Sequence, residues 1–320
     1  MPGPSNYPAG FDTGLTLRNI PVTSAYPGQI FYVYSGSALL PGQRGGSNGN
    51  KGTFNSPFAT IAYAQTQCVA GRGDVIFVKP GHTETVISAT TLVMDKSGVA
   101  VIGLGTGSLR PTVTFTTANT AAIPVSAASC AFKNMIFVAN FLGIARCFTV
   151  TATDFAVEDC LFTDTSSILN FLNIINCTGG ANTADGLTFN NNQVANLGVT
   201  SNNTTILSAN TIDRLTMQRN KLRWAVQNNV AIGVIMTAGI LTNADIGDNL
   251  GYRPNTTTAG GSFITVTGTT STGWVYRNYI QTLTTTADLL FTTTVGLAAF
   301  ENRVTGAVGA TGFVIPAVDS

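Results

Sequence analysis

The residues that could perform acid–base chemistry are few and widely spaced in this sequence. Its 320 residues include fifteen Asp and Glu, sixteen Lys and Arg, and one histidine. Glu158 and Asp159 are adjacent in an expected strand, where successive side chains point to opposite faces, so we do not expect them to act as a pair. Asp245 and Asp248 can converge only if a turn lies between them. The sequence therefore predicts no carboxylate pair of the kind that hydrolyses glycosidic bonds.

Motifs that could bind a cofactor or a metal are equally weak. His82 precedes Glu84 by two residues, but this stretch has the composition of a turn, and we expect a structural histidine. Gly103, Gly105 and Gly107 follow an expected strand, but no helical pattern opens after them, as a nucleotide loop requires. The sequence thus predicts no catalytic, cofactor-binding or metal-binding residue, and a chain that is not an enzyme.

The cysteines are odd in number and have no C-x-x-C spacing. Four of them lie in apolar, strand-like runs, which favours buried free thiols in a reducing compartment over disulfides or a zinc site. They are Cys68, Cys130, Cys147, Cys160 and Cys177.

Composition excludes several classes of partner. The formal net charge is +1, and charged residues make up only 10% of the chain, so no basic surface for nucleic acid or an anionic membrane is predicted. The first residues show no signal peptide, and the longest apolar run, 230–241, is shorter than the ~18 residues of a membrane span. With 44% hydrophobic residues, the chain can form a large core.

The elements that must position these residues follow from an internal repeat. A short strand with alternating apolar residues, one or two polar residues and a further apolar residue recur at intervals of 24 to 32 residues. This period-two alternation excludes a helical solenoid, and a propeller blade is longer, at ~40 residues. We therefore predict an all-β, single-stranded right-handed parallel β-helix of about nine coils. The strand anchors are Phe77, Val101, Phe132, Val157, Phe189, Met217, Ile246, Val275 and Phe300.

Two columns of residues follow from aligning the repeats. Stacked coils lie ~4.8 Å apart, so identical residues at equivalent turns become neighbours. The first column is an asparagine ladder, in which each residue tolerates left-handed backbone geometry and bonds the next: Asn192, Asn220, Asn249 and Asn278. One position earlier is a column of mixed charge, Asp159, Asn191, Arg219, Asp248, Arg277 and Asn302. Asp159 and Asp248 lie three coils apart in it, about 14 Å, too far to act together.

The two ends of the chain differ from the repeat. Residues 1–55 are rich in Pro and Gly and predict an extended arm that packs along its own body or contacts a partner. Its candidate contact residues are Phe11, Leu15, Leu17, Ile20, Phe31, Tyr32 and Tyr34. Residues 56–71 predict a capping helix with Ser56 as N-cap and Pro57 in its first turn. Residues 72–320 form the β-helix body and its closing segment. Proline is absent between Pro124 and Pro254, as central strands require.

An ordered series of segments resembles a family of tailed-bacteriophage virion proteins with the pectate-lyase-like β-helix fold. The segments are 7–11 (YPAGF), 26–31 (YPGQIF), 57–61 (PFATI), 72–82 (RGDVIFVKPGH) and 101–105 (VIGLG). The resemblance implies a non-catalytic capsid cement or decoration protein, without cofactor, that forms a homotrimer and binds the major capsid protein at the virion surface. It transfers no catalytic residue.

Two other functions remain open from the sequence. One is a tail spike or fibre that binds or depolymerises host surface polysaccharide, which requires a long groove with aromatic residues and acids on one face. The other is a free carbohydrate-active enzyme, which would normally carry a signal peptide.

Overall fold

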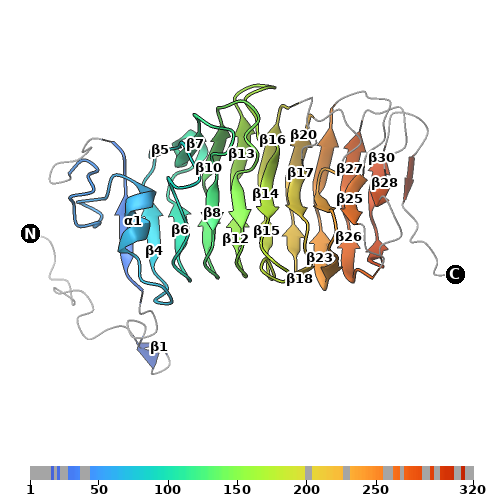
Figure 1. The fold of residues 1–320 in the computed structure, drawn as a ribbon, viewed down its shortest axis with the longest axis horizontal. Coiled ribbons are helices and arrows are strands. Elements are labelled where there is room, and N and C mark those ends of the chain that lie inside the picture. The colour runs from blue at the N-terminus through green and yellow to red at the C-terminus, as the bar shows by residue number, and fades with distance from the viewer. Residues whose placement is uncertain are drawn as a thin grey trace, which may run out of the picture.

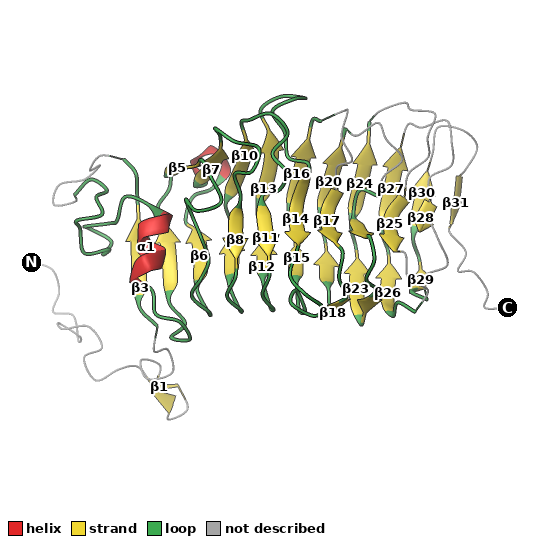
Figure 2. Cartoon of the chain, viewed as in Figure 1, coloured by secondary structure: helices red, strands yellow, loops and turns green. Residues whose placement is uncertain are grey.

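The computed structural model is a parallel β-solenoid built from three sheets that run along its length (Figure 1). It describes residues 16–17, 20–21, 28–36, 44–198, 204–225, 231–254, 262–266, 270–282, 289–291, 296–305 and 311–313. The strands of each sheet pair in parallel from coil to coil, and the solenoid is right-handed, with very little helix (Figure 2). The predicted fold class is confirmed at this level.

Two sheets contain ten strands each and the third contains seven. Sheet 1 comprises β3 (Ile30–Val33), β4 (Val75–Val78), β6 (Ala100–Gly103), β9 (Ala131–Lys133), β12 (Ala156–Glu158), β15 (Thr188–Asn190), β19 (Thr216–Gln218), β23 (Ala244–Gly247), β26 (Gly273–Tyr276) and β29 (Ala298–Phe300). Sheet 2 comprises β5 (Thr83–Val86), β7 (Thr112–Phe115), β10 (Ile136–Ala139), β13 (Leu161–Asp164), β16 (Gln193–Asn196), β20 (Lys221–Trp224), β24 (Leu250–Arg253), β27 (Tyr279–Thr282), β30 (Arg303–Thr305) and the antiparallel β31 (Thr311–Phe313). Sheet 3 comprises β8 (Ile123–Val125), β11 (Phe148–Val150), β14 (Asn173–Cys177), β17 (Thr204–Ser208), β21 (Val234–Met236), β25 (Ser262–Val266) and β28 (Leu289–Phe291).

The remaining elements are short. β1 (Thr16–Leu17) and β2 (Ile20–Pro21) form an antiparallel pair, and β18 (Ile212–Asp213) and β22 (Leu241–Thr242) a parallel one. A 3₁₀ turn occupies Gly107–Leu109, and the α-helix α1 covers Ile61–Gln67.

The predicted number of about nine coils is wrong. Sheet 3 begins only at β8 and has seven strands, so coils with all three sides span about six turns. The count from the sequence followed sheet 1 alone, whose strands continue beyond the three-sided part of the solenoid.

The core is a stack of inward-facing side chains, one row for each sheet. In sheet 1 the register places Val101, Phe132, Val157, Phe189, Met217, Ile246 and Val275 in one fully buried row. Two predicted anchors are displaced by one residue, because Ile76 and Ala299 occupy this row in their strands. Phe77 and Phe300 therefore point outward.

The predicted helix begins too early. α1 starts at Ile61 with Thr60 as N-cap, whose Oγ1 accepts a hydrogen bond from the Tyr63 N–H at 3.1 Å. Residues before it are held differently, because Phe58 N–H donates to the Tyr32 carbonyl at 2.9 Å and extends sheet pairing. Ser56 is therefore not the N-cap of the helix. The predicted role of the helix, to cover the first coil of the solenoid, is not confirmed.

The predicted arm also ends earlier than residue 55. β3 pairs in parallel with β4 and is the first strand of sheet 1, so residues 30–33 belong to the body. Phe31 contacts Phe58 with ring centroids 5.8 Å apart, while Tyr32 lies between Phe54 and Phe77 on the outside. Tyr34 lies beside the Lys79 ammonium. Leu17 and Ile20 pair in β1 and β2, and Phe11 and Leu15 lie outside the described residues.

Two composition-based predictions can be compared with the fold. All five cysteines are buried and free, and burial raises the pKa of Cys68, Cys160 and Cys177 to about 12. Pro124 lies in β8, the edge strand of sheet 3, where a missing N–H costs least. Within the described part of the chain, no helix is long and apolar enough to cross a membrane.

Candidate functional site

A continuous row of asparagines lies at the turn that follows sheet 1. Each Oδ1 accepts the backbone N–H of the ladder residue one coil earlier: Asn220 from Asn192 at 2.8 Å, Asn249 from Asn220 at 3.0 Å and Asn278 from Asn249 at 3.1 Å. Each Nδ2 donates to a strand carbonyl of the preceding coil, as from Asn249 to Met217 at 2.8 Å. All four predicted ladder residues are about 1% exposed.

The row is longer than the sequence indicated. Asn302 accepts from the Asn278 N–H at 3.0 Å and is fully buried, so it belongs to the ladder and not to the charge column. Glu301 takes its place in that column. The misplacement came from the strand anchor Phe300, which was displaced by one residue.

Left-handed backbone geometry falls on the charge column and not on the ladder. The φ values of Asp159, Arg219, Asp248 and Arg277 are 55°, 55°, 58° and 47°. Asn134, Asn191 and Glu301, at the equivalent turns, also have positive φ. A left-handed residue turns the chain sharply, so each strand of sheet 1 ends here and the following asparagine points inward.

The column of mixed charge forms specific pairs across coils. Arg277 binds the Asp248 carboxylate through two bonds, Nε to Oδ1 at 2.7 Å and Nη2 to Oδ2 at 2.9 Å. This hydrogen-bonded arginine lowers the pKa of Asp248, and the carboxylate raises the pKa of Arg277. Asn191 donates to Asp159 one coil before it.

Glu158 and Asp159 do not face opposite sides. Lys133 Nζ lies 3.3 Å from Glu158 Oε2 and 3.3 Å from Asp159 Oδ2. The strand ends at Glu158, and the left-handed turn at Asp159 brings both carboxylates to the same lysine. Their hydrogen bonds raise the pKa of Lys133. A depression of about 210 Å³ is lined by these residues and by Asn190, Asn191 and Arg219.

These groups continue along the outer surface of sheet 1 as one band, here called the outer band. The register aligns the outward positions of successive strands with the turn column beside them. The band crosses seven strands, β9 to β29, or about 29 Å at ~4.8 Å per strand. It consists of Lys133, Glu158, Asp159, Asn190, Asn191, Gln218, Arg219, Asp245, Asp248, Trp274, Tyr276, Arg277, Phe300 and Glu301.

The C-terminal part of the band is aromatic and hollowed. Trp274 is 59% exposed, and its ring meets the edge of Phe300 with centroids 6.0 Å apart. The rings of Tyr276 and Phe300 stack with centroids 5.3 Å apart. The Arg277 guanidinium lies over the Tyr276 ring, 4.9 Å from its centroid. Gly247 makes room for this arrangement, because a Cβ at its position would lie 2.3 Å from the Tyr276 ring.

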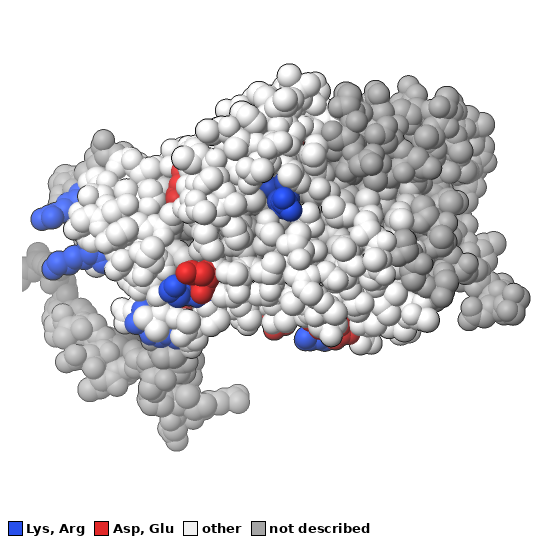
Figure 3. All heavy atoms as spheres, in the orientation of Figure 1, with Lys and Arg blue, Asp and Glu red and all other residues white. Residues whose placement is uncertain are grey.

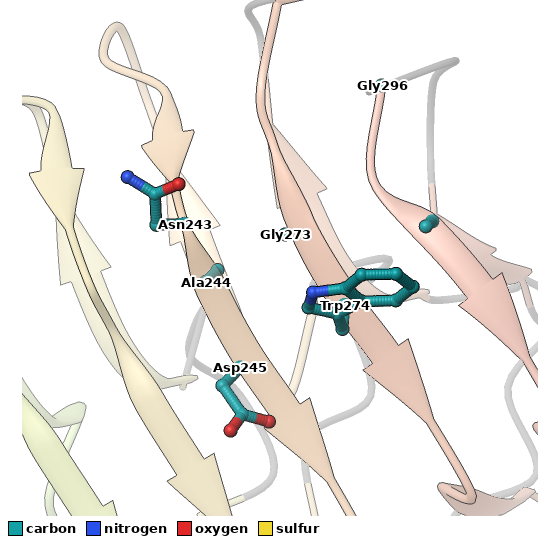
Figure 4. Close-up of a pocket in the computed structure, with 7 residues that line it drawn as sticks. Asn243, Ala244, Asp245, Gly273, Trp274 and Gly296 are labelled. Atoms are coloured by element: carbon teal, nitrogen blue, oxygen red, sulfur yellow. The ribbon is translucent and has the colours of Figure 1, made fainter.

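A shallow pocket of about 510 Å³ opens beside Trp274 (Figure 4). Asp245 and Trp274 are register partners on β23 and β26, and both line it, with Asn243 at its border. Gln218 Nε2 donates to Asp245 Oδ2 at 2.7 Å and to the Tyr276 hydroxyl at 3.2 Å. Burial, and next the Asp245 carboxylate, raise the pKa of Tyr276.

This arrangement suits recognition of a polyhydroxylated ligand. An exposed aromatic ring offers an apolar surface, and the carboxylates, amides and guanidinium beside it offer hydrogen bonds in fixed directions. Asp245 and Asp248 do not converge, because Asp248 is held by Arg277 in the turn and Asp245 by Gln218 on the strand. Among the described residues, no group of three or more His, Cys, Asp or Glu side chains could hold a metal ion.

His82 and Glu84 lie far from the band and serve the fold. Both are buried, with His82 Nε2 3.2 Å from Glu84 Oε2. Glu84 also accepts the Ile61 and Ala62 N–H groups at the start of α1, at 2.6 and 3.2 Å.

The sequence reasoning missed the aromatic part of the site. Trp274, Tyr276 and Phe300 flank core residues by one position, and this outward spacing at period two was the available indication.

Figure 3 shows few charged side chains on the face turned to the viewer, with a group of mixed sign along its lower border.

No family model matches the chain, and no curated protein matches it. Similar solved structures include a rhamnogalacturonan lyase, with a TM-score of 0.42 and 14% identity, covering 90% of each chain. A pectate lyase has a TM-score of 0.38 and 13% identity, covering 90% of this chain and 83% of its own. A periplasmic alginate epimerase has a TM-score of 0.29 and 11% identity, covering 72% and 77%. The fold itself is the parallel β-solenoid that the strand pairing shows.

The prediction that the chain is not an enzyme is not upheld, because the similar solved structures are two lyases and an epimerase; at these TM-scores and identities they show no activity of this chain.

Proposed function

We propose that this chain is a bacteriophage tail-spike β-helix that binds host surface polysaccharide along the outer band. The observation that carries the proposal is the half-exposed Trp274 beside Asp245 and its pocket, at the end of a straight polar band on one sheet. A linear glycan can lie along such a band, with successive sugars over successive coils.

The band also meets the requirement that separates a spike from a shell protein. A glycan-binding spike needs a long surface with aromatic and acidic side chains on one face, and sheet 1 presents both. A shell protein needs a contact surface for capsid subunits, and its expected arm residues 30–33 are a strand of the solenoid body. The spike role is therefore the one proposed, and virion location follows from it.

The test is binding of the purified chain to an array of bacterial surface polysaccharides, followed by calorimetry on the glycans that bind. Trp274→Ala should weaken binding about tenfold or more, the usual effect of truncating a central aromatic contact, with an unchanged melting temperature. Leu109→Ala is the matched control, since Leu109 is 58% exposed but lies in the turn before β7. Equal losses in both variants, or no bound glycan, would reject the proposal.

Two further readouts refine the role. Reducing ends released in the same samples would make the band an active site as well as a binding site. In purified particles a spike is present in far fewer copies than a protein that covers the shell, so quantitative gels separate these two locations.

A further inference from the structure

Charge is unevenly distributed over the surface, although the whole chain has a net charge of only +1. The outer band holds five carboxylates and three cations, which gives it a net charge of −2. The carboxylates are Glu158, Asp159, Asp245, Asp248 and Glu301, and the cations are Lys133, Arg219 and Arg277.

The opposite border of sheet 1, where its strands begin, adds to this excess. Asp154, Asp185 and Asp213 lie there with Arg214, again a net charge of −2. Hydrogen bonds from Thr242 and Asn243 lower the pKa of Asp213, which keeps it ionised. Both borders of the sheet are therefore acidic.

Two of the three cations of the outer band are paired with carboxylates. Lys133 contacts Glu158 and Asp159, and Arg277 holds Asp248 through two bonds. Arg219 lies close enough to Asp248 to contribute to its lowered pKa. To gain a counter-charge from Lys133 or Arg277, an anionic group of a ligand would have to compete with these carboxylates, and at Arg219 it would lie close to the Asp248 carboxylate.

The carboxylates of the band that a hydrogen-bond-donating ligand can reach are those of Glu158, Asp159 and Asp248, whose side chains are 40%, 34% and 36% exposed. Asp245 Oδ2 accepts from Gln218, and its Oδ1 is buried without a hydrogen-bond partner among the described residues. Asp245 lines the pocket next to Trp274, where it adds negative charge beside the ring. Neighbouring strands are ~4.8 Å apart and the screening length is ~8 Å at physiological salt, so several carboxylates act on one ligand charge.

We infer that the glycan bound by the outer band is neutral or carries amino groups, and that polyuronates and other polyanionic glycans are excluded by charge. This inference rests on the proposed function, since it specifies the ligand class of the same site.

The experiment uses an array of bacterial surface polysaccharides in which each acidic member stands beside its carboxyl-reduced, neutral form. The neutral form should bind at least tenfold more tightly than the acidic one at low salt, with a smaller difference at high salt. Glu158→Gln should reduce that difference, because it removes one negative charge and leaves Lys133 with Asp159 as its one remaining carboxylate partner among the described residues. Asp95→Asn should leave it unchanged, since Asp95 pairs with its neighbour Lys96 outside the band.

The outcomes separate the two claims. Acidic glycans that bind as tightly as their reduced forms would overturn the charge inference and leave the proposed function standing. No binding to any member, acidic or neutral, would reject the proposed function itself.

Discussion

Single asparagine residues at the ladder turn satisfy backbone groups that a turn would otherwise leave unpaired. Each one accepts an N–H from one coil and donates to a carbonyl, so adjacent coils are joined by side chains as well as by strands. Buried groups of this kind cost more when left unsatisfied than they contribute when paired.

Asn249→Ala removes the acceptor for the Asn220 N–H and the donor for the Met217 carbonyl, both of which are buried. At about 1–3 kcal/mol for each of these two buried groups left unsatisfied, we expect a loss of about 2–6 kcal/mol in the free energy of unfolding. Urea unfolding measures it. Asn119→Ala is the control, because Asn119 is exposed in a turn and should lose less than about 0.5 kcal/mol.

Asp164 provides a second test at the scale of a residue. It accepts the N–H groups of Phe171 and Leu197 at 3.0 and 2.8 Å while 7% exposed, and burial raises its pKa to about 7. Because the folded state holds this proton more tightly than the unfolded state, its contribution to stability falls as pH rises from about 4 to about 7.

Asp164→Asn should remove this contribution. The difference in unfolding free energy between wild type and variant should change by up to about 4 kcal/mol across that window, in favour of the variant at higher pH. Melting curves at pH 4, 5.5 and 7.5 measure it, with Asp95→Asn for comparison. Parallel curves for wild type and Asp164→Asn would show that Asp164 does not titrate there.

At the scale of elements, the sequence predicted the strands of sheet 1, but not the backbone geometry of the turns after them or the outward-facing aromatic residues. The ladder was visible because four coils carry the same letter, whereas the left-handed column carries Asp, Asn, Arg and Glu, and residue type alone does not reveal its φ. The alternating pattern places Phe77 and Phe300 in the core row, but at period two a shift of one residue reverses the face, and the structure puts Ile76 and Ala299 in that row. Because Phe300 was placed in the core, the aromatic part of the outer band was not predicted.

The start of α1 shows the same limit. Ser56 followed by Pro57 has the composition of a helix start, yet Phe58 forms a parallel bridge with Val33, and the helix begins only at Ile61. Long-range strand pairing outweighed a local preference, as tertiary contacts often do.

Thr60→Ala tests this boundary. Loss of the Thr60 hydroxyl leaves the Tyr63 N–H without its cap, and we expect a cost of about 1 kcal/mol. Ser56→Ala should cost only a few tenths of that amount if the helix starts where the structure places it. Thermal unfolding of the two variants, measured side by side, decides between the two boundaries, since the opposite ranking would restore Ser56 as the cap.

For the whole molecule, the solenoid architecture limits how far along the stack a substitution changes stability. Each strand pairs only with strands of the coils before and after it, so stability is to a first approximation a sum of coil terms and neighbour terms. The same stacking extends the outer band in a straight line, which suits a linear ligand better than a compact one.

A double-mutant cycle can measure this locality. Phe137 and Phe162 face inward on the adjacent strands β10 and β13, and their rings stack with centroids 5.1 Å apart. Phe137→Leu combined with Phe162→Leu should show a coupling of about 0.5–1.5 kcal/mol. Leu222 is buried three strands away on β20, about 14 Å from Phe137, so Phe137→Leu with Leu222→Ala should be additive within about 0.5 kcal/mol. Denaturant unfolding of both cycles gives the two energies. Strong coupling across three coils would mean that the solenoid deforms as one body, and glycan contacts at Trp274 would then depend on packing far from the band.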